Sequence, residues 1–224
     1  MTKTPTPRKT RDEWLNFCQS YLSLALLACD EMLAKKYTVK LMDVDIPAYS
    51  VPSLFLPTIY NIKHGLEVFL KTLRIILNAQ SNPKEGKHSN LEIFTLLKKE
   101  IDSKQIQRVI ESECKKKPDD TNLKLLLKDL ANLSTYVDKI ESLVIKYEHC
   151  EIIKNKIQTD FTIIDEDNTA FRYPQNSLQI KLDYHKILTK ITPEDIQEIR
   201  TDAEALVINL NSLGFILDVY SQYK

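Results

Sequence analysis

Two long stretches of this chain repeat their apolar residues at alternating intervals of four and three, a spacing that constrains the fold strongly. It places the apolar side chains along one face of an α-helix. One stretch lies within a helix expected from about residue 120 to 154, and the other follows the helix start at Thr192. The two sets are Leu126, Leu130, Leu133, Val137, Ile140, Val144 and Tyr147, and then Ile196, Ile199, Ala203, Leu206, Leu210, Leu213, Leu217 and Tyr220. We therefore expect two long helices with heptad-like seams, which pack in a bundle within one chain or across a dimer axis.

The rest of the chain also favours helices. A stripe of Trp14, Cys18, Tyr21, Ala25, Ala28 and Met32 predicts a first helix from Trp14 to about Lys36, and a second is expected over about 58–79. Short helices are expected from Leu91, with Ser89 or Asn90 as the cap, and over about 103–116. With only 3 glycines in 224 residues, the chain lacks the residues that many tight β-turns require. The fold class expected is all-α.

Three segments interrupt the helical pattern. Residues 1–12 carry prolines and basic residues and are expected to form a flexible N-terminal tail, so that a single domain spans residues 13–224. Residues 37–57 contain Pro47, Pro52 and Pro57 and predict an ordered connection or a short strand. Apolar residues on both sides of the turn at Asp165 to Asn168 predict a small β-hairpin inserted at about 157–177.

The charges, apolar runs and cysteines of the sequence bear on its partners and its location. Lys plus Arg equals 31 and Asp plus Glu equals 31, so the composition does not favour a nucleic-acid or membrane partner. The most apolar run, Tyr21 to Cys29, is about half of the ~20 residues that cross a bilayer. Because the four cysteines are isolated and no signal peptide precedes the first helix, we expect a cytoplasmic protein with reduced thiols and no membrane partner.

Motifs for cofactors, metals and common catalytic groups are missing from the sequence. There is no glycine-rich phosphate loop, nucleophile elbow or kinase signature, and no cofactor is expected. The acidic turn at Asp165 lacks the glycine of a calcium loop, and Asn176 stands where its bidentate glutamate would be. The four histidines share no metal-binding spacing, so no metal site is expected.

The second predicted helix carries charged residues at helical spacing. Lys63, Glu67, Lys71 and Arg74 form a polar ridge opposite its buried stripe, and His64 lies on the same face as the last three. As an exposed ridge of ion pairs, this pattern requires no function. The alternative is that the ridge faces His88 and Arg172 across a cleft, where the cluster would suit an anionic ligand such as an RNA phosphate.

Three segments between Thr58 and Asn176 resemble a known family. The helix NIKHGLEVFLKTLRII contains His64, then Glu67 followed four residues later by Lys71. The segment GKHSNLEIFTLL opens the next helix with His88, and DNTAFRYPQN contains Arg172 and Tyr173 before a proline. In their order and spacing these segments resemble the HEPN superfamily, a group of helical domains found in bacterial and archaeal antiphage defence and toxin–antitoxin systems.

The resemblance implies a helical bundle, often a homodimer, that binds or cleaves RNA. Its ribonuclease members carry an arginine and, a few residues later, a histidine that converge on the scissile phosphate. Here Arg172 is followed by a histidine only at His185, and neither Arg108 nor Arg200 has a histidine soon after it. The ribonuclease motif is therefore missing, and the chain is expected to be noncatalytic or divergent.

Three functional hypotheses remain open at this point. The first is a HEPN-like protein that binds RNA, a nucleotide or a partner protein, such as a cognate antitoxin or another defence protein. The second is a dimeric helical scaffold without a ligand site, and the third is a divergent metal-independent ribonuclease, with His64 or His88 as base and Arg172 as phosphate clamp. The expected site residues under the first hypothesis are His64, Glu67, Lys71, His88, Arg172 and Tyr173, the last stacking on a base.

Overall fold

The computed structural model describes residues 8–34, 38–41, 44–47, 52–78, 89–153 and 189–223. Nearly all of these residues are helical, which confirms the all-α fold class. The helices are α1 (Arg8–Ala34), α2 (Pro52–Asn78), α3 (Asn90–Glu100), α4 (Ser103–Lys116), α5 (Thr121–Leu130), α6 (Leu133–Glu148) and α9 (Pro193–Tyr223). The strands β1 (Thr38–Leu41) and β2 (Val44–Pro47) form a short antiparallel pair in which Val39 lies opposite Ile46.

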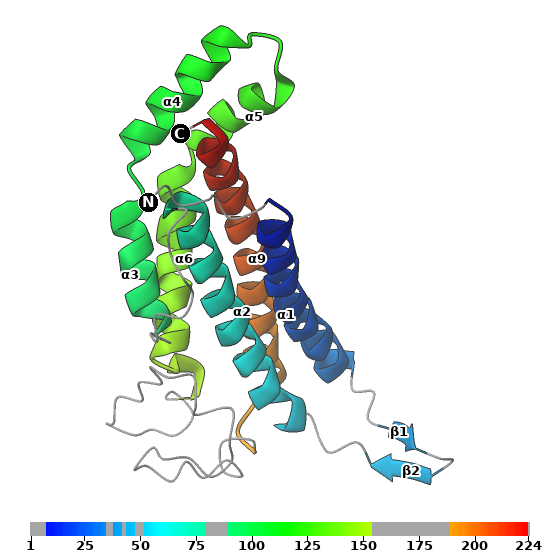
Figure 1. Ribbon diagram of the computed structural model, residues 1–224. Helices are drawn as coiled ribbons and strands as arrows, with labels where there is room; N and C mark the ends of the chain where they lie inside the picture. The colour runs from blue at the N-terminus through cyan, green and yellow to red at the C-terminus, as the bar shows by residue number, and fades with distance from the viewer. Residues whose placement is uncertain are drawn as a thin grey trace.

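The helices α1, α2, α3, α6 and α9 run side by side and form the bundle (Figure 1). α9 packs against α1, α2 and α6, while α3 packs on the outer side of α2 and α6. α4 and α5 form a helical hairpin at one end of the bundle, and the β1–β2 pair lies toward the opposite end. The core is one continuous apolar cluster to which all seven helices contribute.

The two seams expected from the sequence are buried inside a single chain. All eight seam residues of α9, from Ile196 to Tyr220, are at most 3% exposed. The seam residues of α6 are buried as well, and α6 packs directly against α9. The seams therefore provide no free face for a dimer, and the prediction of a dimer requires another surface.

The single long helix expected over about 120–154 is wrong, because the chain turns between α5 and α6. Leu126 and Leu133 lie on either side of this turn at Ala131 and Asn132, and both are buried. α5 packs on α4 and α6 packs along α9 and α3, so the chain must change direction there. α6 also ends earlier than expected, at Glu148, because Cys150 adopts a left-handed φ of 49° that does not continue a helix.

Two helix starts were predicted from their caps, and both are confirmed. Ser89 precedes α3, and its hydroxyl accepts a hydrogen bond of 3.2 Å from the backbone N–H of Glu92. Before α9, the backbone N–H of Thr192 donates to the Asp195 carboxylate at 2.7 Å. The Asp195 N–H in turn donates to the Thr192 hydroxyl at 3.4 Å, which completes a reciprocal cap.

Two other helix starts were predicted too late in the sequence. α1 begins at Arg8, so the last five residues of the expected tail are helical, and residues 1–7 lie outside the described part. α2 begins at Pro52 and continues through Pro57. Pro52 lies in the first helical turn, where proline is favoured. Pro57 lies inside the helix and cannot donate a backbone hydrogen bond, but the nearby Phe55 is fully buried, and its packing outweighs that loss. The hairpin predicted at 157–177 lies outside the described residues.

One helix among the described residues, α9, is long and apolar enough by composition to cross a membrane. Half of its most apolar window is buried inside the bundle. The central helices of folded domains are similarly apolar. The packing of the surrounding helices on α9 explains its apolar composition.

The central position of α9 gives a test of the fold. Leu213→Ala should lower the free energy of unfolding by about 2–5 kcal/mol, because the side chain is fully buried and its removal leaves a cavity. Ile208→Ala on the same helix should change it by no more than about 0.5 kcal/mol, because Ile208 is 63% exposed. Urea unfolding followed by circular dichroism measures both values, and equal losses in the two variants would contradict the position of α9.

Candidate functional site

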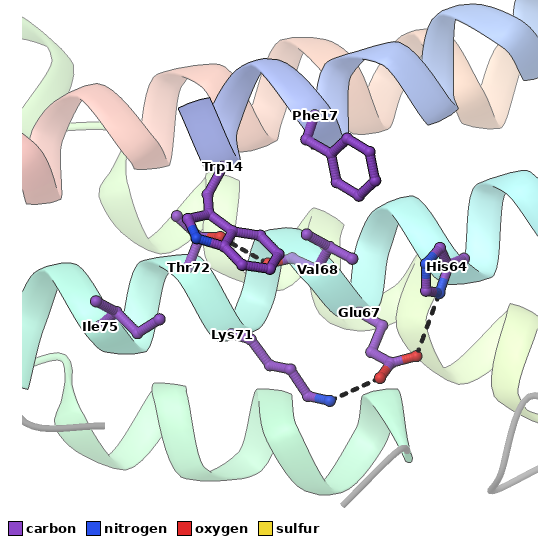
Figure 2. Close-up of a pocket in the computed structure, with 8 residues that line it drawn as sticks. All are labelled: Trp14, Phe17, His64, Glu67, Val68, Lys71, Thr72 and Ile75. Carbon is purple, nitrogen blue, oxygen red and sulfur yellow. Dashed lines mark hydrogen bonds and ion pairs between the residues drawn. The ribbon is translucent and has the colours of Figure 1, made fainter. Parts of the chain in front are cut away.

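A groove of about 260 Å³ lies between the first half of α1 and the middle of α2 (Figure 2). Aromatic side chains of α1 form one wall, and α2 supplies both apolar and charged side chains to the other. The residues that line the groove are Trp14, Phe17, His64, Glu67, Val68, Lys71, Thr72 and Ile75.

A glycine brings the two helices together at one end of this groove. A Cβ atom added at Gly65 would lie 3.0 Å from Cβ of Tyr21 and 3.4 Å from the carbonyl oxygen of Cys18. Any larger residue would push α1 away from α2, since 3.0 Å is shorter than carbon–carbon contact distances. The groove lies beyond this contact, where the side chains of Trp14 and Phe17 stand between α1 and α2.

The charged side chains of the groove form a compact group on α2. The Lys71 ammonium donates to Oε1 of Glu67 at 2.7 Å, and Nδ1 of His64 lies 3.6 Å from Oε2 of the same carboxylate. The Glu67 side chain is only 5% exposed, so its charge requires this pairing. The His64 distance is too long for a hydrogen bond, and Nδ1 of His64 has no hydrogen-bond partner.

The polar ridge expected along α2 is not an exposed ridge, and that interpretation is wrong. Lys63 is completely buried, and Glu67 is nearly so. Arg74 reaches α3, where its guanidinium donates to both oxygens of Glu100 at distances of 2.8 to 3.1 Å. The physical reason is that α3 packs over part of this face, which leaves His64 and Lys71 half-buried beside α1.

Five rings follow one another along the groove. Trp14 meets Phe17 edge to face at 6.2 Å between ring centroids, and Phe17 meets Tyr21 in the same way at 5.0 Å. Tyr21 meets the His64 ring edge to face at 4.7 Å, and His64 stacks on Tyr60 at 5.5 Å. Such pairs each contribute about 0.5–1.5 kcal/mol beyond the burial of their area. This aromatic ladder fixes the imidazole between α1 and α2.

The sequence-predicted site residues are only partly within the described structure. His64, Glu67 and Lys71 come together in the groove, as their spacing predicted. His88, Arg172 and Tyr173 lie outside the described residues, as does the acidic turn at 165–169. The proposed cleft between the α2 ridge and Arg172 therefore stays a prediction.

Sequence reasoning missed the aromatic wall of the groove. Trp14 was assigned to the buried stripe of the first helix, yet it is 38% exposed, and Phe17 was not singled out although it is 48% exposed. A signal was available, because Phe17, Leu24 and Leu27 are apolar residues of α1 that fall outside its predicted stripe. Their presence indicates a helix with a second apolar face.

A second polar cluster joins α2, α3 and α6 inside the bundle. The buried Glu148 carboxylate accepts hydrogen bonds from the Ser89 hydroxyl at 2.5 Å and from the Asn90 backbone N–H at 3.2 Å. The Asn90 side-chain amide donates to the backbone carbonyl of Lys63 at 3.1 Å. These bonds attach the start of α3 to the end of α6, a role of Glu148 that no sequence pattern indicated.

The cysteines near the groove are poor candidates for covalent chemistry. Burial raises the pKa of the Cys18 and Cys29 thiols to about 12, so both remain protonated at neutral pH. A protonated thiol is neither a nucleophile nor a metal ligand. Within the described ranges, no three His, Cys, Asp or Glu side chains lie close enough together to hold a metal ion.

Comparison with protein-family models, with curated proteins and with solved structures found no match to this chain.

The buried cluster generates a stability prediction with a matched control. Glu148→Ala should lower the free energy of unfolding by about 1–3 kcal/mol, because two buried donors lose their acceptor. Glu141→Ala, on the same helix, removes an exposed pair with Lys98 of α3 and should cost no more than about 1 kcal/mol. Chemical denaturation distinguishes the two, and a Glu148 variant as stable as the Glu141 variant would contradict the anchoring role.

Proposed function

We propose that this chain is a noncatalytic, HEPN-like binding protein whose α1–α2 groove holds an apolar side chain of a partner protein. The observation that carries this proposal is the exposure of Trp14 and Phe17 at a groove to which α2 also contributes the apolar side chains of Val68 and Ile75. Tryptophan and other aromatic residues that become buried near the centre of a protein interface supply much of its binding energy. A volume of about 260 Å³ accommodates one or two large side chains.

The charges of the groove favour a protein partner over a polyanion. Lys71 is the one cation among the lining residues apart from His64, and Glu67 neutralises it at 2.7 Å. Affinity for a phosphate backbone comes mainly from uncompensated cations. The whole chain has no excess of positive charge to add, since its formal net charge is zero.

The HEPN-like assignment rests on the three segments between Thr58 and Asn176 and is supported by the all-α bundle. It supplies the proposed biological setting, an antiphage defence or toxin–antitoxin system in the cytoplasm. A cognate antitoxin or another defence protein is then the natural partner for an apolar groove. The noncatalytic assignment rests on the missing Arg and His pair of the ribonuclease members.

A second candidate, binding of RNA or a nucleotide at the same groove, is favoured by one observation. The aromatic ladder places the exposed rings of Trp14 and Phe17 on the same groove as the Lys71 ammonium. Unpaired bases stack on aromatic rings while lysines contact the adjoining phosphates. If RNA or a nucleotide binds here, the ion pair between Lys71 and Glu67 must break so that the ammonium can contact the phosphate.

Removal of the aromatic wall tests the first candidate. Trp14→Ala should weaken partner binding by at least about 30-fold, the loss expected of an aromatic residue at the centre of an interface. The measurement is quantitative mass spectrometry of proteins retained from an extract of the source cells on the immobilised chain. Leu125→Ala is the matched control, because Leu125 is 50% exposed on the distant helix α5. If the wild type, Trp14→Ala and Leu125→Ala retained the same proteins in equal amounts, the partner-protein candidate would be refuted.

Charge changes on α2 test the RNA candidate. If RNA binds, Lys71→Ala should abolish retention of a labelled RNA pool, and Glu67→Gln should increase it, because that change releases the ammonium from its carboxylate. Retention should also fall as salt concentration rises. Absence of retention by the wild type and by Glu67→Gln would eliminate this candidate and leave the protein partner.

A further inference from the structure

Helix α1 lies at the edge of the bundle, where it packs against α2 and α9 (Figure 1). Its inner side, which includes Cys18 and Leu22, is buried in the core. Its outer side nevertheless carries three large apolar side chains that are exposed, Phe17, Leu24 and Leu27. Apolar side chains that gather on one exposed face indicate an interaction surface.

The exposed residues of this outer side have the spacing of a helix–helix seam. They recur at intervals of four, three, four, three and four residues, as the facing positions of a coiled coil do. At 1.5 Å per residue, the row is about 27 Å long. We call this row the outer seam of α1: Glu13, Phe17, Ser20, Leu24, Leu27 and Glu31.

Glutamates close both ends of the outer seam, and no basic residue lies between them. The described side chains of α1, from Glu13 to Ala34, include three acids and no lysine or arginine. One of these acids, Asp30, pairs with Arg200 of α9 at 2.6 Å. Glu31 is exposed and forms no ion pair with another described residue. The outer seam is therefore apolar in its middle and acidic at its ends.

We infer that the outer seam of α1 binds an amphipathic helix of a partner protein, one whose own apolar seam lies between two basic residues. The inference rests on the proposed function, because Phe17 belongs both to the outer seam and to the groove. It specifies the structure and the charge of the partner segment. Apolar side chains of the partner helix contact Phe17, Leu24 and Leu27, and its basic residues pair with the two glutamates.

Ser20, in the middle of the seam, can be covered by an apolar side chain. Its hydroxyl donates to the backbone carbonyl of Asn16 at 2.9 Å. Burial of a hydroxyl is costly when the group loses its hydrogen-bond partner, and this donor keeps its partner within α1. The small serine also leaves space for a larger side chain of the partner between Phe17 and Leu24.

The glutamates make a second copy of α1 a poor occupant of the seam. In an antiparallel pair that brings two outer seams together, Glu13 lies opposite the partner's Glu31, and in a parallel pair each glutamate lies opposite its own copy. Like charges at facing positions oppose association. Lysine or arginine at these positions of a different helix pairs with the carboxylates instead.

Polyanions are equally poor occupants of this seam. A nucleic acid or an anionic lipid surface is attracted by lysine and arginine, which the described side chains of α1 lack. The combination of an apolar middle with acidic ends therefore selects a basic amphipathic helix.

Two synthetic helical peptides test the inference by fluorescence anisotropy with the full chain. Both carry leucines at the intervals of the seam, and they differ only at two end positions separated as Glu13 and Glu31 are. These positions are lysine in one peptide and glutamate in the other. The lysine peptide should bind at least about 10-fold more tightly, because two ion pairs replace two repulsions. Equal affinities would overturn the inference, as would no binding of either peptide, the result expected if the seam is already covered within the chain.

Substitutions in the chain identify the seam as the binding surface. Glu31→Lys should abolish the preference for the lysine peptide, whereas Asp138→Lys, at an exposed position of α6, should leave it unchanged. Leu24→Ser should weaken binding of the lysine peptide at least about 10-fold, since the buried contact of one leucine is lost. Leu125→Ser, at an equally exposed position of α5, is its control. Circular dichroism verifies that the helices are retained.

Sedimentation and the retention of cellular proteins separate the possible failures. Leu24→Ser should leave the oligomeric state unchanged, and a dimer that it dissociates would overturn the inference in favour of a second copy. If Trp14→Ala lowered retention of a cellular protein and Leu24→Ser did not, the proposed function would stand and the inference would fall. If only Leu24→Ser lowered retention, the groove proposal would fall and the outer seam would remain as the binding surface.

Discussion

Burial of the apolar face of α9 is the constraint on which the rest of the bundle depends. Its seam from Ile196 to Tyr220 is closed by α1, α2 and α6, so none of these helices can move without exposing it. Gly214 sets the distance to α2, because a Cβ atom there would lie 3.2 Å from the ring of Phe69. Polar contacts then fix the rotation of the outer helices, with Lys146 of α6 held by Asp202 and Glu198 of α9 at 2.6 Å each.

The groove is a consequence of how the other helices cover α2. α3 covers one flank, where Asn90 donates to the backbone carbonyl of Lys63 and Glu100 forms an ion pair with Arg74. α1 covers the other flank and approaches closely at Gly65, and toward the start of α1 the large side chains of Trp14 and Phe17 line the groove. At the groove, the nearly buried Glu67 carboxylate lies between the His64 ring and the Lys71 ammonium and offsets the lysine charge.

The sequence pattern predicted those parts of the fold that depend on interactions within one or two helical turns. The α9 seam, the bounds of α4 and the caps at Ser89 and Thr192 follow from side-chain spacing and hydrogen-bonding capacity within one turn. The turn at Ala131 could not be predicted, because the seam residues on both sides of it are buried by different neighbours. The anchoring by Glu148 and the bond from Asn90 to the Lys63 carbonyl join α3 to segments distant in sequence, and no periodicity encodes those contacts.

Trp14 illustrates how one pattern can fit two surfaces. It has the spacing of the buried stripe of α1, yet it lies at the end of the helix where α2 diverges, so its ring forms the wall of a groove. The exposed apolar side chains of α1, which are Trp14, Phe17, Leu24 and Leu27, contribute little to the stability of the single chain, because they remain in contact with water. They do favour association, since each loses that contact when a second surface covers it.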